Sequence, residues 1–87
     1  MSLRARTLSK SVHSPDQLAL RGLLVKARKA AGLTQQELSK RLGKPQSFVA
    51  KYEGGERRLD VVEFLAVVRA IGADPIRIIR SLMRHAG

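Results

Sequence analysis

The chain has no cysteine, and its aromatic residues are limited to two Phe and one Tyr among 87 residues. The missing cysteines exclude a disulfide framework and a thiolate metal site. With so few rings, the 44% hydrophobic fraction consists mainly of Leu, Val, Ile and Ala, which suits a helical bundle. The scarcity of aromatics also leaves no stacking platform for single-stranded RNA.

Long apolar runs are missing as well. The longest candidate, Val61 to Val68, is interrupted by Glu63, whereas a membrane-spanning helix needs roughly 20 predominantly apolar residues. The basic residues near the N-terminus are not followed by an apolar segment, so no signal peptide is expected. We therefore expect a cytoplasmic protein without a membrane span.

Acidic residues are few: seven Asp and Glu face seventeen Lys and Arg, which gives a formal net charge of +10. Such an excess favours a polyanionic partner, with nucleic acid the first candidate and an anionic membrane surface the second. Part of the excess is the ordinary solvated surface of helices, as expected for Lys26, Lys29, Lys40 and Arg41.

Residues that carry catalytic chemistry are not grouped in the sequence. There is no recognisable Ser-His-Asp arrangement, metal-ligand cluster or phosphate-binding loop, and the stretch Gly54 to Arg57 lacks the spacing of a Walker loop. The two histidines, His13 and His85, lie near opposite ends of the chain. We expect no enzyme activity, no metal and no cofactor.

The first thirteen residues differ from the rest of the chain. Residues 1–13 carry Arg4, Arg6 and Lys10 among small residues without periodicity, which predicts a flexible basic arm. Residues 14–87 form one predicted domain, and a domain of this size buries only about 60% of the surface that its unfolded chain exposes.

Five helices are predicted from capping signals. Ser or Thr or Asp three residues before Gln or Glu marks a capping box, proline favours the first helical turn, and glycine ends a helix. These signals predict helices beginning at Ser14-Pro15, Thr34, Pro45, Asp60 and Asp74-Pro75, with ends at Gly32, Gly43, Gly54-Gly55 and Gly72. Because no segment has the pattern of a strand, the predicted fold class is all-α.

Apolar residues at spacings of three and four predict the buried face of each helix. The predicted inward positions are, in chain order, Leu20, Leu24, Ala27, Ala31, Leu38, Leu42, Val49, Tyr52, Val61, Leu65, Val68, Ile71, Ile76, Ile79 and Met83.

Residues 34–53 meet the requirements of two short helices that cross at a tight turn. Ser39 supplies a small residue at the crossing, and Gly43 supplies the turn. Apolar residues on both helices lock the interface between them. With Val49 and Tyr52 facing inward, the second of these helices exposes Gln46, Ser47, Ala50 and Lys51.

Several of these residues also match a known pattern. Gly32-Leu33-Thr34-Gln35-x-Glu37-Leu38, Leu42-Gly43, Gln46-Ser47-x-Val49 and Glu53-x-Gly55 together resemble the Xre/Cro/phage-repressor family of helix-turn-helix DNA-binding domains. The resemblance covers about Leu20 to Gly72. It implies a five-helix, lambda-repressor-like domain whose third helix enters the major groove of double-stranded DNA, and a transcriptional regulator, most simply a repressor.

The resemblance also implies which residues contact DNA. Gln46, Ser47 and Lys51 would face the base edges, where Gln suits adenine and Lys suits guanine. Gln35, at the start of the second helix, would hold a backbone phosphate. Further phosphate contacts are expected at Lys44, Arg57 and Arg58.

Phe48 departs from the family pattern, as does Pro45, because many relatives have small polar residues at these places. The ring of Phe48 would either touch a thymine methyl group or pack beneath the helix, and we favour packing.

Arg28 and Glu53 are charged residues on predicted inward faces. Each charge would be costly to bury alone. The resemblance implies an ion pair that anchors the third helix to the first; the alternative is two solvated side chains that extend apart.

Specific recognition of DNA favours a homodimer on a palindromic operator, with half-sites about one helical turn apart. The last helix has Ile78 and Leu82 beside its predicted stripe, so it either forms the dimer surface or closes the core. Two other functions stay open. The chain could be the antitoxin of a toxin–antitoxin pair that regulates its own operon, or Arg77, Arg80 and Arg84 could bind anionic lipid, although these arginines are spread around the helix.

Overall fold

A computed structural model describes residues 13–86, so nearly all of the predicted basic arm, residues 1–13, lies outside the described residues. The described part contains five helices and no strand, which confirms the predicted all-α class. The helices are α1 (Pro15–Ala30), α2 (Gln35–Leu42), α3 (Gln46–Glu53), α4 (Val61–Ile71) and α5 (Pro75–Ala86).

The starts of the helices follow the predicted caps. At α2 the Thr34 hydroxyl accepts a hydrogen bond from the Glu37 backbone N–H at 3.0 Å, and the Glu37 carboxylate accepts one from the Thr34 N–H at 2.9 Å. Asp60 and Glu63 make the same reciprocal pair at α4, at 2.7 and 3.0 Å. These bonds satisfy backbone donors that a helix start leaves without partners.

The turn between α2 and α3 depends on a glycine and a proline. Gly43 ends α2 with φ at 66°, a left-handed conformation that costs glycine little. Pro45 is the N-cap of α3, not a residue of its first turn as the sequence predicted, because the helix begins at Gln46. The Pro45 side chain makes no capping hydrogen bond, so α3 starts without the side-chain cap that α2 and α4 have.

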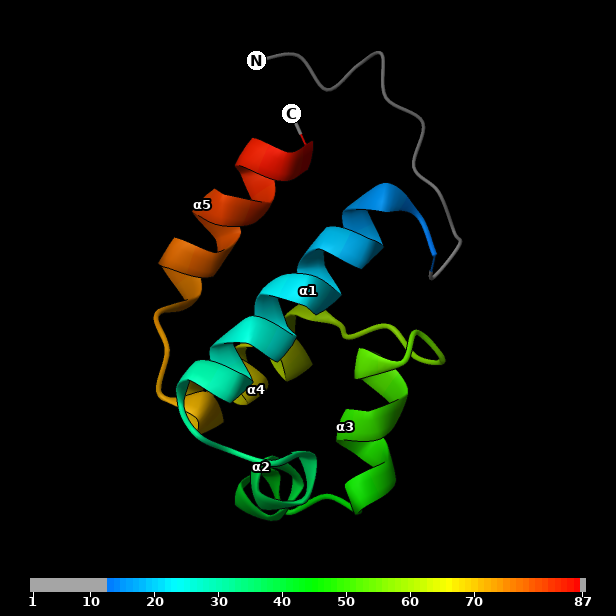
Figure 1. The fold of residues 1–87 in the computed structure, drawn as a ribbon, viewed down its shortest axis with the longest axis vertical. Helices are drawn as coiled ribbons and strands as arrows, with labels where there is room; N and C mark the ends of the chain where they lie inside the picture. The colour runs from blue at the N-terminus through cyan, green and yellow to red at the C-terminus, as the bar shows by residue number, and fades with distance from the viewer. Residues whose placement is uncertain (1–12, 87) are drawn as a thin grey trace.

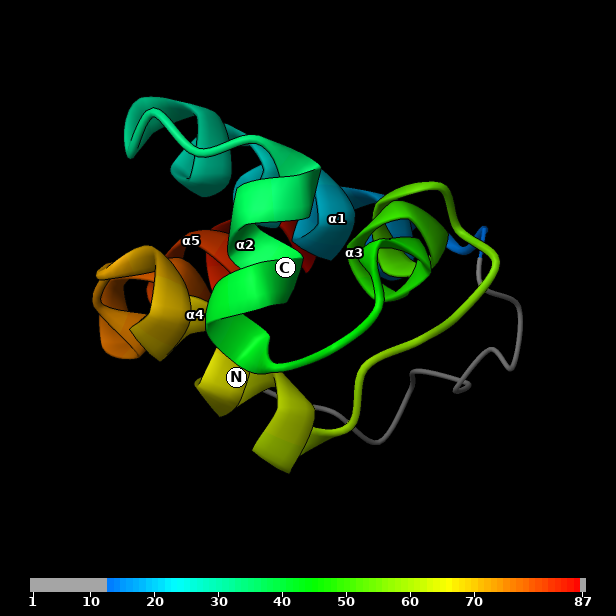
Figure 2. The same cartoon turned by 90° about the horizontal axis from the view of Figure 1, so that it is seen from below.

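The helices are arranged around α1. Figure 1 shows α5 running beside α1, α4 crossing behind it, and α2 and α3 together at one end of the molecule. α2 is viewed along its axis in Figure 1, whereas α3 is viewed along its axis in Figure 2, so the two helices cross steeply. The C-terminal end of α5 lies at the opposite end of the molecule from α2 and the start of α3 (Figure 1).

The core lies where α1, α2, α3 and α4 meet. Its fully buried apolar side chains are Leu24, Leu38, Val49, Tyr52, Val67 and Val68. The sequence analysis had predicted five of these six residues as inward-facing, all except Val67. Each fully buried aliphatic side chain stabilises the fold by about 1.5–3 kcal/mol relative to an exposed one. Leu38 of α2 and Val49 of α3, together with Tyr52, hold the helix-turn-helix to the rest of the domain.

The predicted inward face of α4 was partly wrong. Val61 is 74% exposed, whereas Phe64 and Val67, which the prediction omitted, are buried together with Val68 and Ile71. Residues 61–68 contain two overlapping apolar stripes, and periodicity alone does not select between them. Packing against α1, α2 and α5 selects the stripe that contains Phe64.

The predicted stripe of α5 was also wrong. Ile76, Ile79 and Met83 are exposed, and Ile78 is the buried residue. Apolar residues cover more than one face of α5, and α1 packs against only the face that carries Ile78. At the end of α1, Ala31 is exposed as well, because it follows the last helical residue and is the C-cap.

Candidate nucleic-acid interface

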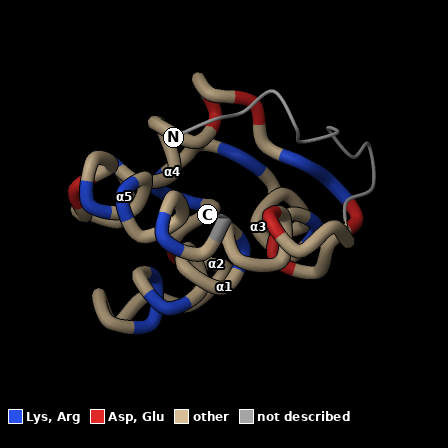
Figure 3. Tube along the Cα trace, turned by 90° about the horizontal axis from the view of Figure 1, so that it is seen from above, with Lys and Arg blue, Asp and Glu red and all other residues tan. Residues whose placement is uncertain are grey.

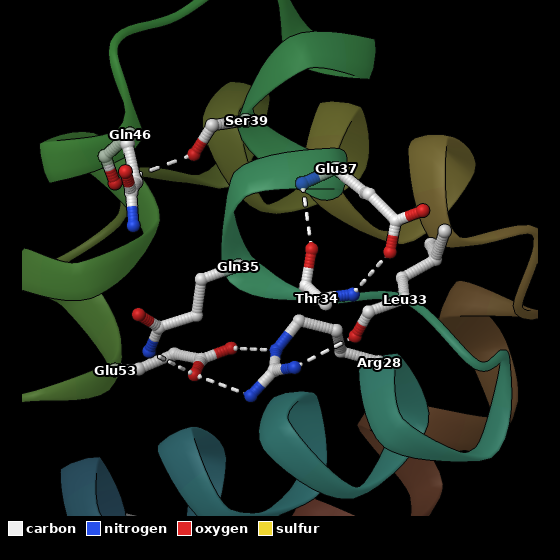
Figure 4. A network of polar contacts seen from close by, with 8 residues as sticks. All are labelled: Arg28, Leu33, Thr34, Gln35, Glu37, Ser39, Gln46 and Glu53. Atoms are coloured by element: carbon white, nitrogen blue, oxygen red, sulfur yellow. Dashed lines mark hydrogen bonds and ion pairs between the residues drawn. The ribbon is translucent and has the colours of Figure 1, made fainter.

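α2 and α3 are joined closely at Ser39. This residue is buried, and its hydroxyl donates a hydrogen bond to the carbonyl oxygen of Gln46 at 3.4 Å (Figure 4). The Lys44 backbone N–H donates to the Ser39 carbonyl oxygen at 3.0 Å, which closes the turn. A small side chain at this position lets the two helices approach, so the position of α3 is set by α2.

α3 has one buried and one exposed side. Val49 and Tyr52 are fully buried, and burial raises the pKa of the Tyr52 hydroxyl, which keeps it uncharged. The opposite side is exposed and carries the polar residues predicted for DNA contact, Gln46, Ser47 and Lys51, together with Ala50. The helix therefore presents a short surface of hydrogen-bond donors and acceptors to solvent.

Arg28 and Glu53 meet in a buried ion pair. Arg28 Nε donates to Glu53 Oε2 at 2.8 Å and Nη2 donates to Oε1 at 3.0 Å, so the carboxylate is bound in a bidentate manner (Figure 4). Arg28 Nη1 also donates to the Leu33 carbonyl oxygen at 2.7 Å. The hydrogen bond to Glu53 raises the pKa of the Arg28 guanidinium against the opposing effect of burial. One guanidinium thus joins α1, the loop after it and the end of α3.

Gln35 belongs to the same network. Its Nε2 donates to Glu53 Oε1 at 2.9 Å, although the sequence predicted this side chain only as a phosphate contact. Gln35 is the first residue of α2, so the bond connects the start of α2 with the end of α3. No sequence pattern indicates this contact, because the two residues are brought together only by the crossing of their helices.

The positively charged residues around α3 differ in their surroundings. Lys44 and Arg58 are exposed, whereas Arg57 is bound to Glu63: Nη1 donates to Oε1 at 3.0 Å and Nη2 to Oε2 at 2.5 Å. The guanidinium of Arg57 also lies over the ring of Phe48, 4.9 Å from its centroid. Lys and Arg occur on all five helices, while Asp and Glu occupy few positions (Figure 3).

Phe48 packs against the core from the side of α3. The ring is half-buried and meets Tyr52 edge to face, with 5.8 Å between the centroids. Its outer side is covered by Arg57 and approached by Lys44, whose Nζ lies 5.7 Å from the ring centroid. The ring therefore packs against side chains of this chain, as the sequence analysis favoured over contact with a thymine methyl group.

Between residues 13 and 86, the structure contains no group of three or more His, Cys, Asp or Glu residues that could hold a metal ion. None of the described helices is both long enough and apolar enough to span a bilayer.

The arrangement of α2 and α3 has clear counterparts in known proteins. The helix-turn-helix family model matches residues 24–78. A solved structure of an XRE-family like protein from Pseudomonas syringae pv. tomato str. DC3000 is 50% identical, with a TM-score of 0.81 over 87% of this chain and 93% of that one. The chain belongs to the Xre/Cro-type helix-turn-helix family. Members of this family are DNA-binding transcription regulators.

A more distant structural neighbour of this helix-turn-helix protein shows the same fold. The clp gene regulator ClgR from C. glutamicum is 19% identical, with a TM-score of 0.72 over 83% of this chain and 94% of that one. No curated protein sequence matches the chain significantly. The family match continues to residue 78, within α5, and so extends past Gly72, where the sequence analysis placed the end of the shared pattern.

Proposed function

We propose that this helix-turn-helix protein binds double-stranded DNA sequence-specifically by inserting α3 into the major groove, and that it represses transcription from the promoters that it occupies. The observation that carries the proposal is the exposed polar face of α3 on a fully buried base formed by Val49 and Tyr52. The Arg28–Glu53 pair fixes the end of this helix, so its side chains are presented without a large ordering cost on binding.

Base recognition is assigned to Gln46, Ser47 and Lys51. The Gln46 amide can donate to and accept from adenine N7 and N6, and Lys51 can donate to guanine O6 and N7. Ser47, beside Gln46 in the first turn, can bond a base or a phosphate. All three side chains are exposed on the same short helix, which is the element that can enter a groove about 12 Å wide.

Phosphate binding is assigned to Gln35, Lys44 and Arg58. Gln35 is the first residue of α2, where unpaired backbone N–H groups and the helix dipole favour an anion. Its side-chain amide donates one N–H to Glu53, which leaves the other N–H and the carbonyl oxygen available for a phosphate group or its water. Lys44 and Arg58 lie in the segments before and after α3 and are exposed. These contacts would orient the protein on the duplex without reading its sequence.

Selection of bound duplexes from a random pool tests the proposal directly. Enrichment of a palindromic consensus is expected, because a two-fold dimer reads two equivalent half-sites. A pool that shows no enrichment after repeated rounds would contradict sequence-specific binding and favour the antitoxin function, in which a partner protein is the main ligand.

Gln46→Ala and Arg58→Ala are expected to weaken DNA binding in different ways. Loss of the Gln46 amide should reduce discrimination at one base pair by about 1–3 kcal/mol, because one bidentate contact is lost. Loss of Arg58 should weaken binding to all duplexes equally, whatever their sequence. Titration of both variants against the selected site and its single-base variants separates the two effects, and an equal loss on all duplexes for both variants would argue against base reading by Gln46.

The proposed homodimer would use apolar surface on the side of the molecule that carries α5. Ile76, Ile79 and Met83 are exposed there, and an apolar groove lies between α1, α5 and the start of α4. Sedimentation of the purified protein should give a dimer that dissociates on dilution. A monomer at high concentration that co-purifies with a small second protein would instead support the antitoxin alternative.

A further inference from the structure

Arg57 was expected to contact a phosphate, yet its guanidinium is already engaged on two sides. Nη1 and Nη2 bind the two carboxylate oxygens of Glu63, and Nη1 also donates to the Arg58 carbonyl oxygen at 3.2 Å. The central carbon of the guanidinium also lies over the Phe48 ring, 4.9 Å from its centroid. A planar guanidinium can bind a carboxylate and stack on a ring at the same time, which a lysine ammonium cannot do.

Glu63 is held in the charged form that this pairing requires. Besides Arg57, its Oε1 accepts the backbone N–H of Asp60 at 3.0 Å in the capping box of α4. The hydrogen bonds from Arg57 and from the Asp60 backbone lower the pKa of the Glu63 carboxyl to about 2. The pair therefore stays ionised near neutral pH and has no net charge. If Arg57 left Glu63 for a phosphate, it would leave an unpaired carboxylate beside the DNA.

The stacked ring connects this pair to the DNA-reading helix. Phe48 follows Ser47 in the first turn of α3, and its ring contacts both the Arg57 guanidinium and the buried Tyr52 ring. Glu63 belongs to α4 and Arg57 to the loop before it, so the contacts run from α4 through the loop to the start of α3. Because the N-cap of α3, Pro45, makes no side-chain capping hydrogen bond, contacts of this kind contribute to holding its first turn.

Building on the proposed function, we propose that Arg57 is a positioning residue: it holds the first turn of α3 through Phe48, and its charge is compensated by Glu63 instead of by a DNA phosphate.

The salt dependence of DNA binding separates this role from a phosphate contact. The double variant Arg57→Gln with Glu63→Gln removes the pair without changing the net charge, and Arg58→Gln is the matched control in the same loop. For each protein, the affinity for the selected duplex is measured from low to high salt. We expect the double variant to keep the wild-type slope of log K against log salt, whereas Arg58→Gln should reduce its magnitude by about 0.9, the value for one lost phosphate contact.

Arg57→Lys tests the same idea with the charge retained. A phosphate contact would largely survive this change, but stacking combined with bidentate pairing would not. We expect an unchanged salt slope and a ratio of specific to non-specific affinity that falls about two- to fivefold, the size of one exposed cation–π contact. The double variant should lower this ratio by at least as much. Circular dichroism at the assay temperature confirms that each variant is folded before its binding is compared.

Two results would overturn the inference while leaving DNA binding intact. One is a double variant whose slope decreases by about 0.9, as for a lost phosphate contact; the other is an Arg57→Lys protein with the full wild-type specificity ratio. If the wild-type chain binds no duplex at any salt concentration, the proposed function fails first and the inference fails with it, so the two failures are distinguishable.

Discussion

Arg28→Ala is expected to lower the free energy of unfolding by about 3 kcal/mol, the lower end of the cost of breaking a buried ion pair. The change would leave the Glu53 carboxylate buried with the Gln35 amide as a side-chain donor but without its cation, and it would remove the donor that Arg28 supplies to the Leu33 carbonyl oxygen. Because small domains are only marginally stable, a loss of this size is a large part of the total.

Thermal unfolding followed by circular dichroism measures the effect, with Lys29→Ala as the control. Lys29 is the next residue of α1 and is exposed, so its replacement should change the stability by no more than about 0.5 kcal/mol. At about 4–8 °C per kcal/mol for a domain of this size, Arg28→Ala should lower Tm by roughly 12–24 °C. Equal and small shifts for the two variants would show that the pair does not anchor α3.

DNA affinity is expected to fall by about 500-fold when the salt concentration rises from 50 to 200 mM, if Lys and Arg side chains neutralise about five phosphates. The slope of log K against log salt would then be near −4 to −5. The high net charge of +10 and the exposed Lys44, Lys51 and Arg58 around α3 are the basis of this expectation.

Fluorescence anisotropy with a labelled duplex gives the slope, and an unrelated duplex of equal length serves as the comparison. Both duplexes should show a steep dependence on salt, since phosphate contacts do not depend on sequence, whereas the offset between the two lines measures base recognition. A slope near zero, or two coincident lines, would contradict the proposed mode of binding.

Local signals in the sequence were sufficient to locate the helices. The capping boxes at Thr34 and Asp60 and the left-handed glycines at Gly43 and Gly72 act within four residues of the chain, so the same residues make the same bonds in the structure. The helix-turn-helix was also predictable, because its small, apolar and polar positions follow a short fixed spacing. The resemblance added the pairing of Arg28 with Glu53, which spacing alone did not specify.

The roles of other residues depended on which helices pack together. Val61 and Phe64 are equally plausible core residues in a sequence with overlapping stripes, and only packing against α1, α2 and α5 distinguishes them. Arg57 is a basic residue close to α3 in the sequence, as expected of a phosphate contact, but the path of the loop after α3 brings it to Glu63 and Phe48.

By itself, the sequence determined the helical class, the helix starts and ends, the residues at the crossing of α2 and α3 and the polar face of α3, because these depend on interactions between residues close in the chain. Only the tertiary structure decided which faces of α4 and α5 are buried, that Gln35 joins the Arg28–Glu53 pair, and that Arg57 is engaged by Glu63. Those features require side chains from separate elements to meet. Because hydrophobic burial is non-directional, the periodicity of apolar residues is compatible with several packings. The way the helices assemble selects one of them.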